Sequence, residues 1–249
     1  IHGIIMIVGT IIMVTGPFGN FIMPIMIGAR DMAFPRLNAL SFWLIVAAIP
    51  PILSAFFLGG ITTGWSAYEP LASQAPAGMD GYIMFIVIFA ISTMVAGANI
   101  TATVIRMRAK GMTWNRTPIF VYGTVASVAL ALPAFPVFFL SQVMSAFDRA
   151  IGTTFYNAKM GGSLWLYENL FWLMGHPEVY VILIPAVAAL MEMVNEMYEY
   201  TSGGVSQKQV QVLRAAIDAL TLLISPFAPH FAEELWKSLA NKDSIANAL

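Results

Sequence analysis

Residues 175–180 place a histidine, a carboxylic acid and a phenol inside an otherwise apolar stretch of the chain. Ionisable side chains are costly within a bilayer, so an intramembrane His or Glu indicates an ion, proton or metal site. His176 and Tyr180 are four residues apart and share one face of a helix. Imidazole suits transition metals, and a buried histidine otherwise needs a hydrogen-bond partner. We predict that His176 binds a metal; a core histidine bonded to a backbone carbonyl is the alternative.

Other polar residues suggest proton handling. Desolvation favours the neutral form of Glu178, and a neutral acid can donate and recover a proton. The alternative is a carboxylic acid that is hydrogen-bonded in a helix interface. Asp31 lies in a polar turn with Asn20 and Asn38 nearby, and such a group can collect protons and order water. Turns also favour Asp and Asn for backbone hydrogen bonding, which is the structural alternative for these three residues.

The elements that must position these residues are membrane-spanning helices. The 249-residue chain is 59% hydrophobic and 10% charged, which excludes an ordinary soluble protein. About 20 apolar residues cross the hydrocarbon core, and only helices satisfy the backbone in a lipid-exposed segment of this kind. Five runs are long enough: residues 4–29, 39–68, 81–105, 119–147 and about 163–188. Only the fifth carries carboxylates.

Loop charges predict the orientation of these spans. Loops 28–38 and 106–118 together carry six Lys and Arg residues, against two in the opposite loops, which places the first two loops on the inner side. The chain has no cysteine, so it can form neither a disulfide nor a thiolate metal site. Its net charge of −1 gives no indication of a nucleic-acid partner.

The character of the chain changes after residue 186, where charged residues appear at the density of a soluble protein. Residues 210–224 follow a helical period of apolar positions with polar residues between them, which predicts an amphipathic helix. Gly203 and Gly204 mark the turn before it, and a last short helix contains Glu233 and Trp236. The predicted fold is all-α: a polytopic transmembrane bundle of about five spans over residues 1–186, followed by a soluble helical tail over residues 187–249.

Three strings in the first part carry a family resemblance. They are Gly-His-Pro-Glu-Val-Tyr at 175–180, Gly-Ala-Arg-Asp-Met-Ala-Phe-Pro-Arg-Leu-Asn at 28–38, and Gly-Trp-Ser-Ala-Tyr-Glu-Pro-Leu at 64–71. In this order they resemble subunit I of the haem-copper respiratory oxidases, the cytochrome c oxidase family. The resemblance covers about residues 1–186.

The resemblance implies roles for particular residues. His176 corresponds to a copper ligand, Tyr180 to the phenol joined to it, and Glu178 to a proton relay. His2 corresponds to an axial ligand of the low-spin haem iron, and Trp172 lies beside the copper. The positions of Asp31, Asn20 and Asn38 belong to the mouth of a proton-uptake channel. His2 also has a simple alternative as a frayed terminal histidine.

The resemblance also implies a function for the intact parent. Such a protein contains a low-spin and a high-spin haem and copper, and it reduces oxygen to water with electrons from cytochrome c or quinol. This reaction is coupled to proton translocation, with other oxidase subunits as partners, in a bacterial plasma membrane or the mitochondrial inner membrane. The family needs six histidine ligands and this chain has three histidines, so we expect a part of the catalytic subunit without activity of its own.

The tail resembles a different family. Residues 188–198 and 222–236 look like the anticodon-binding domain of leucyl-tRNA synthetase, which predicts a chimeric chain joined near residues 185–187. In that case tRNA is a partner only if the tail is functional. Two other hypotheses remain for the whole chain: a non-catalytic, proton-conducting helix bundle, and a tRNA-binding tail on a membrane anchor.

Overall fold

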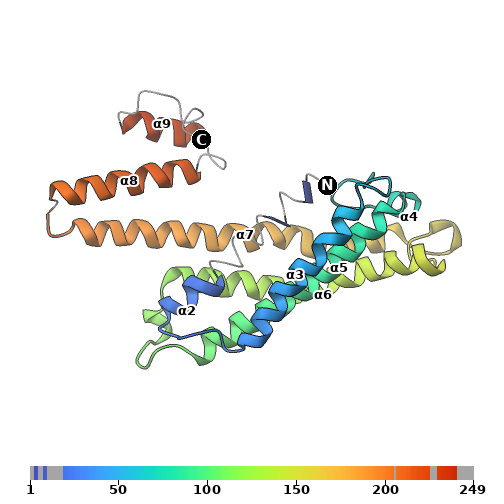
Figure 1. Cartoon of the computed structure of the whole chain (residues 1–249), viewed down its shortest axis with the longest axis horizontal. Coiled ribbons are helices and arrows are strands. Elements are labelled where there is room, and N and C mark those ends of the chain that lie inside the picture. Colours follow the sequence, from blue (N-terminus) through green and yellow to red (C-terminus); the bar gives the residue numbers. More distant parts are fainter. Residues whose placement is uncertain (1–2, 5–7, 10–18, 205, 225–228, 240–249) are drawn as a thin grey trace. The chain divides into compact units, whose positions relative to one another are not determined.

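The predicted all-α class is confirmed. The structure, a computed structural model, describes residues 3–4, 8–9, 19–204, 206–224 and 229–239, and these contain no strand. The elements are shown in Figure 1. They are α2 (Met23–Met26), α3 (Pro35–Ser54), α4 (Leu71–Gln74), α5 (Gly78–Arg106), η2 (Trp114–Arg116), α6 (Ile119–Ile151), η3 (Ala158–Met160), α7 (Leu164–Thr201), α8 (Gln207–Ile224) and α9 (Pro229–Ser238).

Four of the described helices, α3, α5, α6 and α7, are long and apolar enough to cross a membrane. They correspond to the second to fifth predicted spans. Within the first predicted span, residues 4–29, residues 5–7 and 10–18 lie outside the described residues; the described end of the span includes α2. The chain is therefore an integral membrane protein whose spans carry the candidate site.

The second span is shorter than the sequence suggests. The uncharged run continues to residue 68, but α3 ends at Ser54. Pro50 and Pro51 lack the amide hydrogen that would bond to the preceding turn, which weakens the end of the helix. Gly59 and Gly60 then adopt left-handed backbone angles, with φ of +90° and +79°. Residues 55–70 therefore form a loop, although they are as apolar as a span.

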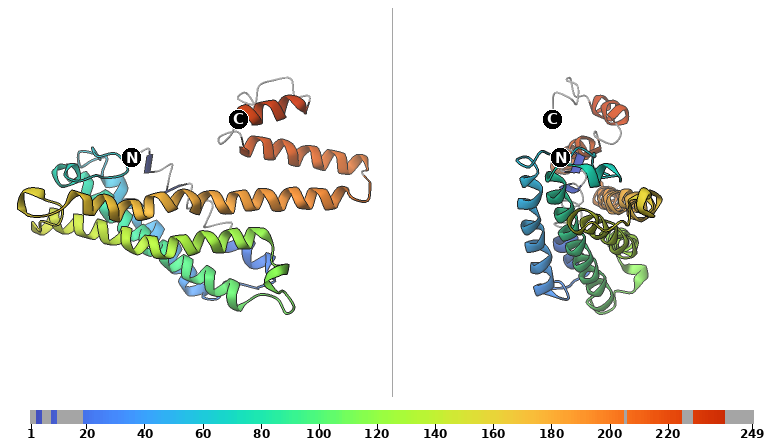
Figure 2. Two further views of the ribbon diagram at one scale, coloured as in Figure 1. Left: turned by 180° about the vertical axis from the view of Figure 1, so that it is seen from behind. Right: turned by 90° about the vertical axis from the view of Figure 1, so that its right-hand side faces the viewer.

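Close approaches between helices depend on small residues. In unit 1 of the chain, residues 1–189, α5 lies between α3 and α6 (Figure 2). A Cβ at Gly81 would lie 2.3 Å from the Pro51 carbonyl oxygen of α3. A Cβ at Gly123 in α6 would lie 2.6 Å from the Ala188 Cβ of α7. Glycine at these two positions lets the backbones pack at distances that a larger residue would prevent.

The second compact unit contains residues 190–249. α7 continues as one helix through residue 186 and ends at Thr201, so the change in composition does not end the helix. The predicted turn follows, with Gly204 at φ +92°. α8 and α9 are the two predicted tail helices, and they pack against each other.

Candidate functional site

His176 and Tyr180 lie together on α7, as their spacing predicts. Their ring centroids are 5.2 Å apart, and the rings meet edge to face at 70°. Both side chains are exposed, and Tyr180 retains 42% of its accessible surface. We expected both to be buried; instead they lie on a face of α7 that no described helix covers. The pair can therefore contact a group that approaches α7 from outside the described bundle.

Trp172 lies one turn before His176 and is held by aromatic neighbours. Its Nε1 donates a hydrogen bond to the Tyr68 hydroxyl, and its ring meets Trp65 edge to face at 5.9 Å. Gly175 leaves room for the indole, because a Cβ there would lie 2.8 Å from a Trp172 ring carbon. The indole remains 41% exposed. The next turn of α7 thus begins beside a fixed aromatic side chain.

The loop that supplies Trp65 and Tyr68 is anchored by a buried carboxylate. Glu69 is 6% exposed and accepts hydrogen bonds from the hydroxyls of Ser145 (2.8 Å) and Ser73 (2.6 Å). The nearby Tyr156 hydroxyl donates to a backbone carbonyl of α6. Burial raises the pKa of Tyr156 above its ordinary value, and the negative charges of Glu69 and Asp148 raise it further. This phenol therefore stays protonated and keeps its hydrogen bond.

The described residues do not complete a metal site. No three His, Cys, Asp or Glu side chains among them are close enough to hold an ion together. Protein metal centres of the N and S type take three or four protein ligands, and His176 supplies one imidazole. His2, the predicted haem ligand, lies outside the described residues, and His230 belongs to α9 in the other unit. Among the described residues of unit 1, His176 is therefore a single imidazole, and a metal bound to it would need further ligands from elsewhere.

Glu178 faces the opposite side of α7 from His176. Two residues correspond to about 200° around a helix. The Glu178 side chain is 5% exposed and lines a small cavity of about 20 Å³ with Tyr82, Met174 and Phe89, among others. Such a space holds about one water molecule. The carboxyl of Glu178 therefore lies beside a space that can hold water.

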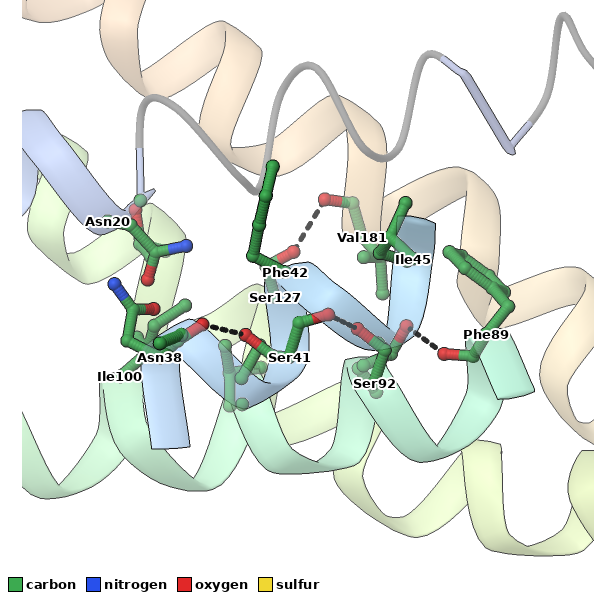
Figure 3. Close-up of a pocket in the computed structure, with 18 of the residues that line it drawn as sticks. Asn20, Asn38, Ser41, Phe42, Ile45, Phe89, Ser92, Ile100, Ser127 and Val181 are labelled. Atoms are coloured by element: carbon green, nitrogen blue, oxygen red, sulfur yellow. Dashed lines mark hydrogen bonds between the residues drawn. The ribbon is translucent and has the colours of Figure 1, made fainter. Parts of the chain in front are cut away.

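A second, larger cavity brings three predicted residues together. It has a volume of about 660 Å³ and lies between α3, α5, α6 and α7 (Figure 3). Asn20, Asp31 and Asn38 line it. The side-chain oxygens of Asn20 and Asn38 are buried and have no hydrogen-bond partner among residues that the structure describes, and the two amides face each other in Figure 3. Asp31 is exposed, so this end of the cavity carries a carboxylate that can exchange protons with solvent.

The turn that carries Asp31 is fixed to α5. The Asn99 side chain accepts a hydrogen bond from the Phe34 amide (2.9 Å) and donates to its carbonyl (3.2 Å). The Thr103 hydroxyl accepts from the Ala33 amide (2.9 Å). Asn99 and Thr103 share one face of α5, four residues apart. They place the turn, and with it Asp31, beside the cavity.

Hydroxyl groups line the cavity further along, and sequence reasoning missed them. Ser92 of α5 donates to the Ser41 carbonyl of α3 (2.7 Å), and Ser127 of α6 donates to the Val181 carbonyl of α7 (2.5 Å). Thr93 also lines the cavity. These hydroxyls hold the helices together and leave their oxygens free to accept from water. The sequence did contain a signal for them, because small polar residues recur within spans that carry no charge.

Phe89 connects the two cavities. It lines both the large cavity and the small cavity of Glu178, so its side chain lies at the boundary between them. Polar groups thus follow one another from the exposed Asp31, past the facing amides and the hydroxyls, to this phenylalanine. Water in the large cavity could carry protons between the exposed carboxylate and the neighbourhood of the buried acid.

These features define a class of protein: an α-helical integral membrane protein with a cavity between its spans that carries several polar side chains, and with a buried acid and an exposed imidazole on opposite faces of one helix. The family model for cytochrome c and quinol oxidase polypeptide I matches residues 1–228. The chain belongs to this family, which confirms the resemblance found in the first part of the sequence. The match continues past the change in composition at residue 186.

Individual relatives agree. Cytochrome c oxidase subunit 1 of Thermostichus vulcanus is 38% identical over 195 residues, which are 78% of this chain and 35% of that protein. The subunit 1 of Bacillus subtilis cytochrome c oxidase is 40% identical over 70% of this chain and 28% of its own length. Ubiquinol oxidase subunit 1 of Acetobacter aceti is 40% identical over 78% of this chain and 30% of its own length. The chain spans about a third of the length of these relatives.

Proposed function

We propose that this chain forms part of the catalytic subunit of a respiratory terminal oxidase. The complete subunit would reduce oxygen to water with electrons from cytochrome c or quinol and translocate protons, together with other oxidase subunits. A bacterial plasma membrane is the proposed location, with the mitochondrial inner membrane as the alternative. The observation that carries the proposal is the division of α7 into two faces, with His176 on one and Glu178 on the other.

The exposed face of α7 would contribute to the oxygen site. His176 would bind copper through its imidazole, and Tyr180 would lie against it on the same face, as their ring contact of 5.2 Å supports. Trp172, held by Tyr68, would position the preceding turn. His2 would be an axial ligand of the low-spin haem. When bound, the haem and copper groups of such a subunit supply electrons to oxygen.

The buried face would handle protons. Asp31 would take protons from the inner side, and Asn20 and Asn38 would order water at the entrance of the large cavity. Their unpartnered oxygens support this role, because buried acceptors normally find a partner, often an ordered water. Glu178 would hold a proton at the far end, beside its small cavity, and release it toward the oxygen site.

The test is the copper content of the complete oxidase assembled with variants of this chain. We expect His176→Ala to remove copper and oxygen consumption, because the imidazole is a direct ligand. His230→Ala is the matched control, since its side chain is exposed on α9, and it should leave both unchanged. Full copper content in the His176→Ala protein would refute the proposed ligand role.

A proton-conducting bundle without redox chemistry remains the second candidate, and the polar side chains that line part of the large cavity favour it. It predicts that the chain alone, reconstituted in vesicles, carries a proton flux that Glu178→Gln stops and that needs no haem. Such a flux together with a normal copper content in the His176→Ala oxidase would replace the first proposal by this one.

For the tail, we propose as a finer possibility that residues 187–249 derive from a tRNA-synthetase anticodon-binding segment, which would make tRNA a partner of this unit. The amphipathic helices α8 and α9 and the unit boundary at residue 190 support it. The family match to residue 228 speaks for an oxidase origin instead. Independent reading of the nucleotide sequence across codons 185–187 tests the junction. If the oxidase reading frame continues across these codons, the chain is not a chimera.

A further inference from the structure

The loop between α5 and α6 contains an arginine, Arg108, of which two nitrogens have no hydrogen-bond acceptor among the described residues. Arg108 lies with its guanidinium carbon 3.8 Å from the centroid of the Trp114 ring. Its Nε and Nη1 atoms are buried, and no acceptor in the described part of the chain forms a hydrogen bond with them. Guanidinium groups removed from water are normally paired or hydrogen-bonded. This group has an aromatic face on one side and lacks the anion that would complete its surroundings.

The loop itself is firmly built. The Ala109 amide donates a hydrogen bond to the Ile27 carbonyl at 2.8 Å. Gly28 leaves space for the Ala109 side chain, because a Cβ at residue 28 would lie 2.9 Å from the Ala109 Cβ. The Thr117 hydroxyl donates to the Thr113 carbonyl at 3.1 Å, which closes the segment around η2. Arg108 is therefore held in one place by a fixed backbone and a ring, unlike a freely moving surface arginine.

The surroundings favour an anion at the membrane surface. Residues 106–118 carry four Lys and Arg residues and no Asp or Glu. The segment joins two membrane-spanning helices, so it lies where lipid head groups are found. Trp114 and Tyr122 pack together and are 40% and 41% exposed, as is typical of aromatic residues at the membrane interface.

We propose that Arg108 and Trp114 form a binding site for the phosphate of an anionic phospholipid head group. The Trp114 ring orients the guanidinium, and its N–H groups donate to phosphate oxygens, the geometry for which arginine is suited. The Arg108 side chain as a whole is only partly buried, so a head group can approach its accessible part. This site is separate from the cavities and from α7, and it does not depend on the proposed oxidase function.

The experiment is native mass spectrometry of the full chain, released from membranes that contain equal amounts of phosphatidylglycerol and phosphatidylcholine. We expect the wild-type chain to retain phosphatidylglycerol preferentially. Arg108→Gln should lower that preference about 10- to 100-fold, the effect of losing a charge-assisted contact. Lys110→Gln removes the same charge from an exposed side chain of the same loop and should lower it about fivefold at most.

Two further variants keep the test clear. Arg108→Lys retains the charge but loses the planar donor group, so it should fall close to Arg108→Gln. Trp114→Leu leaves Arg108 in place and should also lower the preference, which guards against a folding defect caused by changing the arginine. If Arg108→Gln and Lys110→Gln lower the preference for phosphatidylglycerol equally, the proposed site is wrong. General electrostatic attraction between the loop and anionic lipid would then explain the binding. If inorganic phosphate displaces the lipid, the site binds free phosphate, and the proposal of a lipid head group is wrong.

Discussion

Replacing Asn38 by leucine tests whether the large cavity carries water and protons. The cavity of about 660 Å³ has room for on the order of 20 water molecules. If it is filled, the Asn38 amide bonds to about two of them. Losing two such hydrogen bonds, each worth about 0.5–1.5 kcal/mol, would raise the barrier to proton movement by about 1–3 kcal/mol. Proton uptake would then slow about five- to 150-fold.

A dry cavity gives the opposite signature. The Asn38 oxygen would then be an unsatisfied buried acceptor, which destabilises the folded state by about 1–3 kcal/mol. Leucine would remove this cost, so the free energy of unfolding would rise by a similar amount and proton uptake would not depend on the residue. For Asn38→Leu, a water-filled cavity therefore predicts slower proton uptake, whereas a dry cavity predicts a higher free energy of unfolding.

The assay is proton uptake into vesicles that contain the complete oxidase, followed by a pH-sensitive dye during oxygen reduction, together with unfolding of the same variants. Asn115→Leu is the matched control, because Asn115 is exposed and does not line the cavity. We expect slower uptake for Asn38→Leu alone, with little change in stability. Wild-type uptake with increased stability would refute the proton path through this cavity.

Three further predictions follow from the packing and the two faces of α7. Glu178→Gln should stop proton translocation while copper content stays unchanged, because the acid and the imidazole lie on opposite faces; loss of copper would contradict this. Gly175→Ala should lower oxygen consumption and disturb the indole fluorescence of Trp172, since the new methyl would lie 2.8 Å from its ring. Gly123→Ala should destabilise the bundle by about 1–3 kcal/mol through overpacking against Ala188, measured by thermal unfolding in detergent.

Matched controls exist for each of these variants. Glu234→Gln changes an exposed acid on α9 and should leave proton translocation intact. Gly203→Ala adds a methyl where no atom lies within 4 Å, and it should affect neither fluorescence nor stability. A stability loss at Gly203 equal to that at Gly123 would show that the effect comes from glycine replacement in general and not from the helix contact.

The sequence predicted the spans and the motif geometry because both depend on local rules. Runs without charge identified α5 and α6, a long apolar run identified α7, and the spacing of four residues placed His176 and Tyr180 together. The end of α3 was missed because the apolar residues after Ser54 could equally continue a helix. Their loop is set by backbone angles at Gly59 and Gly60 and by packing against α5, which hydropathy does not report.

The candidate site was predicted residue by residue, but its shape was not. Asp31, Asn20 and Asn38 were selected as a polar turn, and only the packing of four helices shows that they share a cavity. The hydroxyls of Ser92 and Ser127 were missed because a single serine in a span is equally compatible with a helix contact. In the structure they serve that contact and line the cavity as well.

The arrangement of α7 explains why its two reactive residues can be adjacent in sequence without sharing an environment. A separation of two residues turns the side chains about 200° apart, so Glu178 enters the bundle where His176 leaves it. The bundle therefore encloses the side of α7 that carries the acid, whereas the side that carries the imidazole is open among the described residues. An open face with a single imidazole can become a metal site only when further ligands are brought against it. It follows that copper binding should require the rest of the subunit, whereas the environment of Glu178 is already enclosed by helices of this chain.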